Sequence, residues 1–450
     1  MSAATEIAQV ELAAIVGAAR VVADPAACAA FAVDGQAPQY VVYPTSPDEV
    51  AAVLRCAAAR DLAVIPCRNA TKLGVGNPPR RYDVALSLKD LNRVWHYEPA
   101  DLTITAEPGM KLGDFQHFVA RDGLWLPLDP PGGARASLGG IVATNAAGPL
   151  RLAYGAPRDI VLGMKIATTE GKIVKTGGRV VKNVTGYDVG KLLIGSYGTL
   201  GVIVEISFKL FPLPPQRATF VIAAGTLGVA RDLRQRILQS PLSPARMVLL
   251  DRCAAQQAGA TAAEHTWTGP EIWLEVMGSA RLIERCRREL GELAGPAGAY
   301  ARGVDAASAE NVWARATNFH PWVADAARSA VIVKATMPDS ALEELVSRAE
   351  QEAEAESAEI AVFAQLGVGI VHLCILTQLG APALLGLIQR LRASAEGLGG
   401  ALIVEHCPPE IKQHIDVWGE AGDSLELMKK LKAVWDPQGI LAPGRFLGRL

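Results

Sequence analysis

Short apolar runs alternate with amphipathic stretches along the first half of the chain. Many runs have apolar residues at every second position, which is typical of strands, whereas Pro47–Arg60 and Leu112–Asp122 have the spacing of helices. Glycine-containing turns separate these segments. The predicted strands are YVVYP (40–44), AVIPC (63–67), DVALSL (83–88), LTITAEPG (102–109), LWLPLDP (124–130), VLGMKIAT (161–168), GKIVKTGG (171–178) and GVIVEISFKLFP (201–212).

A second pattern begins after the proline-rich segment PLPPQ at 212–216. From 218 to 293 the predicted order is strand, helix, strand, strand, helix. After a helical stretch at 306–317, the order strand, helix, strand, strand, helix, strand follows from 330 to 406. This is the ferredoxin-like order, and its recurrence predicts one larger antiparallel sheet covered by helices.

The fold class is therefore predicted to be α+β, with three parts along the chain. Because three prolines in five residues break any regular element, we place the first boundary there. The third part holds one predicted helix, Ser424–Val434, and the tail DPQGILAPGR. The predicted domains are 1–215, 216–405 and 406–450.

Composition narrows the class of protein. Half of the 450 residues are apolar and a fifth are charged, which is typical of a compact soluble chain with more than one core. A net charge of -2 gives no indication of a nucleic-acid partner. The first residues carry Glu6 and Glu11 and lack a basic start, so they predict a helix and not a signal peptide. With no apolar run near the ~18 residues of a membrane span, we expect a cytoplasmic protein whose association with a membrane, if any, is peripheral.

The positions of the cysteines exclude two kinds of metal centre. Seven are scattered along the chain without a C-x-x-C pair, so neither a zinc ribbon nor an iron–sulfur cluster is encoded. A cytosolic chain of this size needs no disulfides, and buried free thiols are expected.

Three runs of small and polar residues in the first half point to a phosphate-containing ligand. They are CRNATKLG (67–74), PPGGARASLGGIVATNAAG (130–148) and GSYGTLGVI (195–203). Turns of this kind aim backbone N–H groups at a diphosphate, cations balance its charge, and glycine lets the main chain approach a flat ligand. Each run alone could be a plain turn, but three around one β-rich core favour a binding site. No G-x-G-x-x-G occurs, so the usual dinucleotide fingerprint is absent.

The order of these runs resembles the FAD-binding domain, of the PCMH type, in the vanillyl-alcohol oxidase superfamily. ASLGGIVATNAAG, LAYGAPRDIVLGMKI, GGRVVKNVTGYDVGKLLIGSYGTLGVIVEISFKLFP and WDPQGILAPGRF are each similar to a motif of that superfamily. Members of this superfamily include D-lactate dehydrogenases and glycolate oxidase flavin subunits. The second FAD-binding subunit of glycolate oxidase is similar to this chain through NPPRRYDVALS, PPGGARASLGG, KNVTGYD and HIDVWGEAG. The similarity is strong over 35–215 and from about 403, and loose between. It implies a PCMH-type FAD domain of two α/β subdomains beneath the ferredoxin-like cap.

The resemblance implies which residues bind FAD. Residues of the first loop would wrap the diphosphate, the second run would lie along the diphosphate and flavin, and backbone of the third would reach the adenine. These residues are Arg68, Asn69, Ala70, Thr71, Lys72, Gly139, Gly140, Thr144, Asn145, Gly148, Tyr154, Gly155, Gly201 and Ile203.

Two departures from the family pattern concern the cofactor. Arg68 and Ala70 stand where members usually have glycine, and Ala442 stands where asparagine is common. Neither excludes FAD. Because no histidine lies in either FAD loop, the covalent histidyl linkage of some relatives has no candidate there, and noncovalent FAD is predicted.

The resemblance also implies a substrate site in the cap. Hydroxy-acid dehydrogenases of this family place a metal-binding H-x-x-x-x-x-x-H motif and a Glu-His pair above the flavin. Here Gln365 replaces the first histidine, while His372 and the pair Glu405–His406 are present. A divalent metal prefers at least three protein ligands and glutamine is a poor one, so no metal is predicted. The alternative for these side chains is a structural role at a strand.

A substrate carboxylate would need a cation from the cap. Arg315 lies one position early relative to the family's W-x-x-R, which rotates it by ~100° around a helix. Lys334 lies in the region of a substrate lysine. The alternative for both is a solvent-facing charge.

Two functions are consistent with these residues. In the first, the protein oxidises a 2-hydroxy acid such as glycolate or D-lactate by hydride transfer to flavin N5, with His406 as the base and with Glu405, His372, Arg315 and Lys334 in the site. In the second, it is a non-catalytic or electron-relaying flavin subunit of a glycolate oxidase-like complex, which Gln365 favours. In both, we expect another flavoprotein and an iron–sulfur protein as partners, through which the chain could lie at the inner face of a membrane. Quinone is the alternative electron acceptor. A binding protein without flavin would require the three glycine-rich runs to be coincidental.

Overall fold

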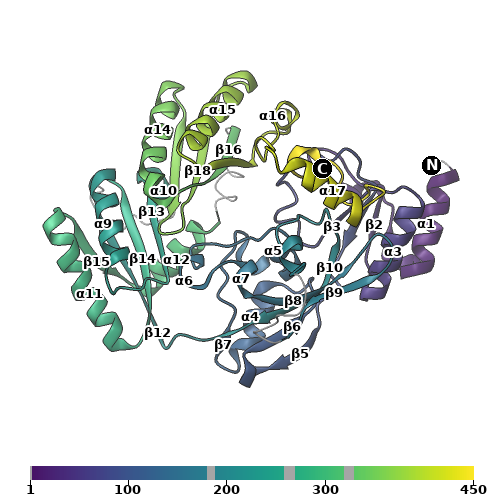
Figure 1. Ribbon diagram of the computed structural model, residues 1–450, viewed down its shortest axis with the longest axis horizontal. Coiled ribbons are helices and arrows are strands. Elements are labelled where there is room, and N and C mark those ends of the chain that lie inside the picture. Colours follow the sequence, from purple (N-terminus) through teal and green to yellow (C-terminus); the bar gives the residue numbers. More distant parts are fainter. Residues whose placement is uncertain (1–2, 180–187, 258–268, 319–328) are drawn as a thin grey trace.

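The computed structural model describes residues 3–179, 188–257, 269–318 and 329–450. Figure 1 shows two lobes, one with the N-terminal half and the C-terminal helices and one with a large sheet covered by helices. Most of the KNVTGYD motif lies at 182–187, outside the described residues.

The first sheet of the N-terminal lobe has four strands, and three of them are parallel. Its strands, in spatial order, are β1 (Val21–Val22), β2 (Tyr40–Val42), β4 (Val84–Ser87) and β3 (Val64–Cys67). Helix α3 (Pro47–Ala59) connects β2 to β3, as its apolar spacing predicts. It begins where Ser46 accepts a hydrogen bond from the Glu49 amide and where Pro47 occupies the first turn. Helix α1 (Ala3–Val16) packs against α3.

The second sheet of this lobe has five antiparallel strands, in the order β5-β6-β10-β8-β9. Their bounds are β5 (Val94–Glu98), β6 (Thr103–Ala106), β10 (Val202–Lys209), β8 (Val161–Ala167) and β9 (Ile173–Gly177). Its core is shared with α4 (Leu112–Ala120) and with the short helix α5 (Leu138–Ala143), which the sequence did not predict.

The predicted strand LWLPLDP is mostly irregular. Only β7 (Leu124–Trp125) is paired, with β11 (Phe211–Pro212). Pro127 and Pro130 have no backbone N–H to donate, which limits pairing beyond this point.

The cap is an eight-stranded antiparallel sheet in the order β15-β12-β14-β13-β17-β18-β16-β19. Its strands are β12 (Gln216–Ala223), β13 (Arg246–Leu250), β14 (Glu271–Gly278), β15 (Tyr300–Val304), β16 (Ser329–Thr336), β17 (Glu359–Gln365), β18 (Ile370–Thr377) and β19 (Ala401–His406). Each half has ferredoxin-like order, and pairing of β13 with β17 joins the halves. The predicted α+β class with a ferredoxin-like cap sheet is thereby confirmed.

Helices cover the two faces of the cap sheet unequally. One face packs against α9 (Leu227–Gln239), α11 (Ala280–Ala294), α14 (Leu342–Ala355) and α15 (Ala381–Gly397) in a large apolar core. The other face carries α10 (Arg252–Gln257) and α12 (Ala306–Ala316) and a smaller core. Lys334, His372 and Gln365 lie on this second face, because they share the strand parity of Ile332, Cys374 and Phe363 in its core.

The C-terminal part returns to the first lobe. After β19 come α16 (Pro409–His414) and α17 (Leu425–Trp435), and Figure 1 shows α17 beside the first lobe. The Val64 amide donates to the Ile440 carbonyl (2.8 Å), and the Ala442 amide donates to the Val64 carbonyl (2.9 Å). The tail therefore lies along β3 and extends the first sheet.

Candidate cofactor cavity and active site

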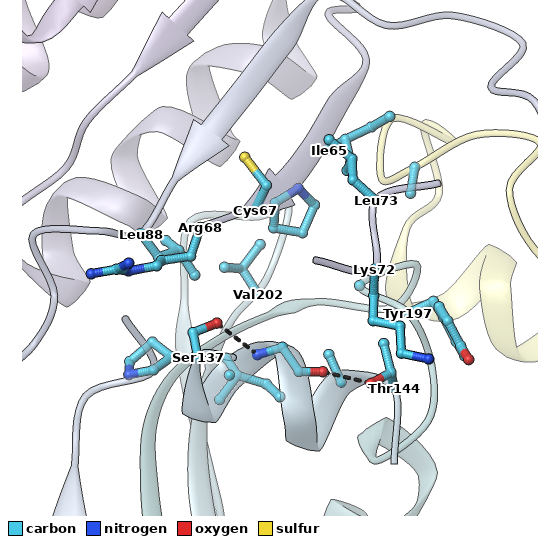
Figure 2. Close-up of a pocket in the computed structure, with 18 of the residues that line it drawn as sticks. Ile65, Cys67, Arg68, Lys72, Leu73, Leu88, Ser137, Thr144, Tyr197 and Val202 are labelled. Carbon is cyan, nitrogen blue, oxygen red and sulfur yellow. Dashed lines mark hydrogen bonds between the residues drawn. The ribbon is translucent and has the colours of Figure 1, made fainter. Parts of the chain in front are cut away.

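A cavity lies between the two sheets of the first lobe and encloses about 1020 Å³, including its open mouth. Its walls come from β3 and the loop after it, from α5, from the turn before β10 and from the C-terminal tail (Figure 2). Ten of the fourteen residues predicted to bind FAD line it. They are Arg68, Asn69, Ala70, Thr71, Lys72, Gly139, Gly140, Thr144, Gly201 and Ile203.

The first loop is held in place by its own polar side chains. Arg68 donates from Nε to the Gly109 carbonyl (3.0 Å) and contacts the Asn69 amide oxygen through its guanidinium. Asn69 in turn donates to the Arg135 carbonyl. These two side chains fix the loop against the turn after β6 and against the segment before α5.

Helix α5 forms the opposite wall, and each of its two glycines is suited to its position for a different reason. A Cβ on Gly139 would lie 2.6 Å from the Pro108 Cβ, so close packing requires glycine there. Gly140 is exposed, and a Cβ there would meet only the Ser137 hydroxyl, at 3.1 Å. Thr144 donates its hydroxyl to the Gly140 carbonyl (2.7 Å). Gly140 thus gives a ligand access to the main chain.

Non-glycine residues with left-handed backbone gather at the cavity. Ala70 (φ 57°), Tyr197 (φ 55°) and Ala442 (φ 43°) line it, and Asn145 (φ 48°) follows α5. Such conformations cost about 1 kcal/mol or more each and persist where surrounding structure enforces them, often at functional sites. Ala70 therefore takes the conformation that glycine supplies in the family, with its Cβ in place.

Four predicted residues lie outside the cavity wall, as far as the structure describes it. Asn145 accepts a hydrogen bond from the Arg158 amide (3.2 Å). Gly148 packs on Asp129, whose carbonyl oxygen would lie 2.0 Å from an added Cβ. Gly155 allows the Asp159 carboxylate to approach and has φ 82°. They shape the segment behind α5.

Tyr154, the fourth of these, belongs to the contact between the lobes. Its ring packs edge-on against Trp125 (5.4 Å between centroids) and Phe211 (5.3 Å), and its hydroxyl lies 3.8 Å from the Met277 sulfur of β14. It therefore anchors the cap on the first lobe.

A buried polar group reinforces this contact. Arg246 of β13 lies 3.6 Å from the Asp129 carboxylate and 2.9 Å from Glu275, over the Trp313 ring. Burial raises the pKa of Asp129 to about 7, although Arg246 and a hydrogen bond from the Leu150 amide favour its charged form.

Arg445 is a structural residue that the sequence analysis did not single out. Its guanidinium donates to the carbonyls of Leu73 (2.5 Å), Val75 (2.5 Å) and Asn77 (3.2 Å). It is 6% exposed and lines the cavity. The available signal was a charged residue within the recognised tail motif WDPQGILAPGRF, but its partners lie some 370 residues earlier and could not be inferred from spacing.

A polar cluster joins the first loop to the cap. Lys72 Nζ lies 3.7 Å from Glu405 Oε1, and His372 Nε2 lies 3.9 Å from Glu405 Oε2. Lys334 is the cross-strand partner of His372. Lys72 comes from an element hundreds of positions before the other three residues, and those three were predicted substrate-site residues.

A β-bulge places His406 on the same face as this cluster. The pairing of β19 with β16 runs Lys334↔Ile403 and Val333↔Val404 and then shifts to Ile332↔His406. Because Ile332 and Lys334 share one face, His406 faces the same side as Lys334, and Glu405 is the extra residue. Burial lowers the pKa of His406, and the nearby Lys412 ammonium lowers it further.

Arg315 lies apart from the cluster. Val312, Trp313 and Ala316 form the buried side of α12, while Arg315 is exposed. This agrees with an arginine displaced around the helix relative to the family motif, and a place for Arg315 in the substrate site remains only a prediction.

Comparisons with known proteins identify the two main domains. Residues 38–177 match the model of the FAD binding domain, and residues 213–446 match that of the C-terminal domain of FAD linked oxidases. The mitochondrial D-lactate dehydrogenase [cytochrome] of Arabidopsis thaliana is 29% identical over 91% of this chain and 73% of its own. Glycolate oxidase subunit GlcD of Bacillus subtilis (strain 168) is 26% identical over 92% of this chain and 89% of its own.

Solved structures agree on the fold. Alkyldihydroxyacetonephosphate synthase has a TM-score of 0.78 at 15% identity, covering 98% of this chain and 86% of that one. p-Cresol methylhydroxylase with substrate bound has a TM-score of 0.77 at 15% identity, covering 99% and 97%. Within the described part of the chain, no helix is long and apolar enough to cross a bilayer. This chain belongs to the FAD-linked oxidases, with an FAD-binding domain of the PCMH or vanillyl-alcohol oxidase type.

Proposed function

We propose that this protein oxidises a 2-hydroxy acid, with FAD bound noncovalently in the cavity between the two sheets. Bound FAD supplies a hydride acceptor at N5. The observation that carries the proposal is the cluster of Lys72, His372, Lys334 and Glu405 between the first loop and the cap. Relatives named D-lactate dehydrogenase and glycolate oxidase support the substrate class.

The residues that line the cavity support FAD as its ligand. The loop at 68–72 would hold the diphosphate through its backbone, and the exposed main chain at Gly140 would lie against the cofactor. Asn145, Gly148 and Gly155 would act indirectly, by fixing α5 and the segment after it. No histidine lies in the loop or in the α5 run, which supports noncovalent attachment.

His406 is the proposed base for the substrate hydroxyl. It lies on the same sheet face as Lys334 and His372, and its lowered pKa keeps the imidazole neutral near pH 7. Lys334 would bind the substrate carboxylate, and Glu405 with His372 would orient the groups around it.

A second candidate is an electron-relaying flavin subunit of a larger complex. Gln365 favours it, because it stands at the position of a family metal ligand, and its buried amide oxygen has no hydrogen-bond partner among the described residues. The relative named as a glycolate oxidase subunit also supports a complex, with a flavoprotein and an iron–sulfur protein as proposed partners.

Turnover of the purified holoprotein with an artificial electron acceptor distinguishes the 2-hydroxy-acid oxidase from the electron-relaying subunit. A panel of glycolate, D-lactate, L-lactate and D-2-hydroxyglutarate should reveal at least one substrate that reduces the dye. Activity that appears only with co-purified partner chains would favour the relay function. Acid precipitation should release the yellow chromophore, and a yellow pellet would contradict noncovalent binding.

A further inference from the structure

The first loop directs its lysine toward the cap. Lys72 Nζ lies 3.7 Å from Glu405 Oε1, with only 14% of the lysine side chain and 7% of the glutamate side chain exposed. Figure 2 shows Lys72 beside Tyr197 and Thr144, while Arg68 extends at the opposite side of the cavity. Lys72 and Arg68, the two cations of the loop, therefore lie at different sides of the cavity, although the sequence suggested one shared role at the diphosphate.

Positive charge exceeds negative charge where Lys72 meets the cap. Glu405 is the acidic group beside Lys72, and the same carboxylate acts on Lys334. The charges of Lys72 and Arg151 also act on Lys334. One carboxylate thus faces several cations, so an additional anion would be stabilised there.

The residues present do not fit the metal ion that the resemblance to hydroxy-acid dehydrogenases implies at this place. Gln365 takes the position of one ligand, and the described residues contain no group of three or more His, Cys, Asp or Glu side chains suited to a metal. Lys72 already places an ammonium against Glu405, where a divalent cation would be repelled. A lysine from the first loop therefore supplies positive charge that a metal would otherwise provide.

We propose that Lys72 and Lys334 jointly bind the carboxylate of the substrate, so that the substrate site is built from both lobes. This inference rests on the proposed function for the identity of the ligand. Lys72 lines the cofactor cavity, and its ammonium reaches the cap strand that carries the proposed base. A ligand carboxylate held by both ammonium groups would lie between the cavity and β16, which carries Lys334.

Oxalate, a dianion that cannot be oxidised as a hydroxy acid, tests the site without turnover. Its dissociation constant for the holoprotein is measured by calorimetry, and FAD content is measured from the 450 nm absorbance. Lys72→Met should weaken oxalate binding by ~10- to 100-fold, the usual loss of a charge-assisted hydrogen bond, and leave FAD content normal. Lys72→Arg should retain most of the affinity. The matched control, Lys429→Met, removes an exposed lysine of α17 that pairs with Glu426 and should bind oxalate like the wild type.

The diphosphate is the competing anion for Lys72, and the same experiment separates the two. Loss of FAD with unchanged oxalate affinity in the remaining holoprotein would assign Lys72 to the diphosphate and overturn the proposal. Failure of the wild type to bind oxalate would overturn it as well. Oxalate binding that depends on Lys72, in a protein that oxidises no 2-hydroxy acid, would support the inference and reject the proposed function.

A second variant covers the case in which Lys72→Met folds poorly because Glu405 loses its partner. The double variant Lys72→Met with Glu405→Gln removes both charges of the pair. It should fold with normal FAD content and bind oxalate at least ~10-fold more weakly than Glu405→Gln alone, which lacks the same carboxylate. Equal oxalate affinity in these two variants would contradict the role of Lys72.

Discussion

Glu405 and His406 are consecutive residues of one strand, yet both face the side of the cap sheet that carries Lys334 and His372. A regular strand would direct them to opposite faces. Glu405 has the strand parity of Ile403, the partner of Lys334, and it reaches Lys72 and His372. The register shift between β16 and β19 pairs His406 with Ile332, which turns His406 to the same face. Bulges commonly re-aim side chains next to active sites.

If His406 is the base, His406→Ala should slow flavin reduction by ~10²-fold or more, the usual loss of a general base. FAD content should stay normal, because His406 is not among the described residues that line the cavity. Stopped-flow absorbance at 450 nm measures the rate. His96→Ala, which alters an exposed histidine of β5, is the control and should reduce at the wild-type rate. An unchanged rate in His406→Ala would remove His406 from the reaction.

The pH dependence of turnover should reflect the lowered pKa of His406. Burial and Lys412 disfavour the imidazolium, so the base stays neutral below the ordinary histidine value of 6.5. We expect kcat/KM to be flat from pH 8 down to 6.5 and to fall only at lower pH. A decline that starts above pH 6.5 would show that another group is the base.

The cavity wall at Gly140 offers a test of where FAD binds. Gly140→Asp would place an anion against the diphosphate or the flavin, so the 450 nm absorbance per protein should fall strongly. The fold should persist, because the added Cβ meets only a rotatable hydroxyl. Gly291→Asp, at an open position of α11, is the matched control and should keep its flavin. Equal flavin content in both variants would place the cofactor elsewhere.

Asp129 should make the stability of the protein depend on pH. The pKa of Asp129 is about 7 in the folded protein, whereas its ordinary value is 3.8. Between these two pH values the folded state therefore holds a proton that the unfolded chain releases. Stability should therefore fall as pH rises through this window. Asp129→Asn should melt like the wild type near pH 4, and at a higher temperature than the wild type at pH 8.

Melting curves at both pH values measure this difference. A variant that is less stable than the wild type at pH 8 would show that the ion pair with Arg246, 3.6 Å away, outweighs the cost of burial. Lys429→Met, far from this contact, should leave the pH dependence unchanged.

The elements of the fold could be predicted because each depends on local pattern. Helix α3 was expected at Pro47–Arg60 and lies at Pro47–Ala59, and the recurring strand order indicated the two ferredoxin-like halves of the cap. Helix α5 was not predicted, since its glycines indicate a turn. Its start is nevertheless encoded locally, by Ser137 accepting a hydrogen bond from the Gly140 amide.

The site could be predicted only in its residue types. The resemblance indicated Glu405, His406 and Lys334, but the bulge that directs His406 is a property of strand register, which one strand's sequence does not determine. The contact of Lys72 with Glu405 joins residues of two lobes. Lys72 was assigned to the diphosphate because a cation next to a small-residue turn usually has that role. The sequence of the loop gives no indication of its contact with the cap.

Anaerobic titration of the purified holoprotein with 2-hydroxy acids tests the central claim most directly. We predict that glycolate or D-lactate bleaches the 450 nm flavin band stoichiometrically, and that His406→Ala bleaches at least ~10²-fold more slowly with the same flavin content. A flavin band that no 2-hydroxy acid bleaches, in a preparation that dithionite reduces fully, would contradict the proposed oxidation and leave the electron-relaying function.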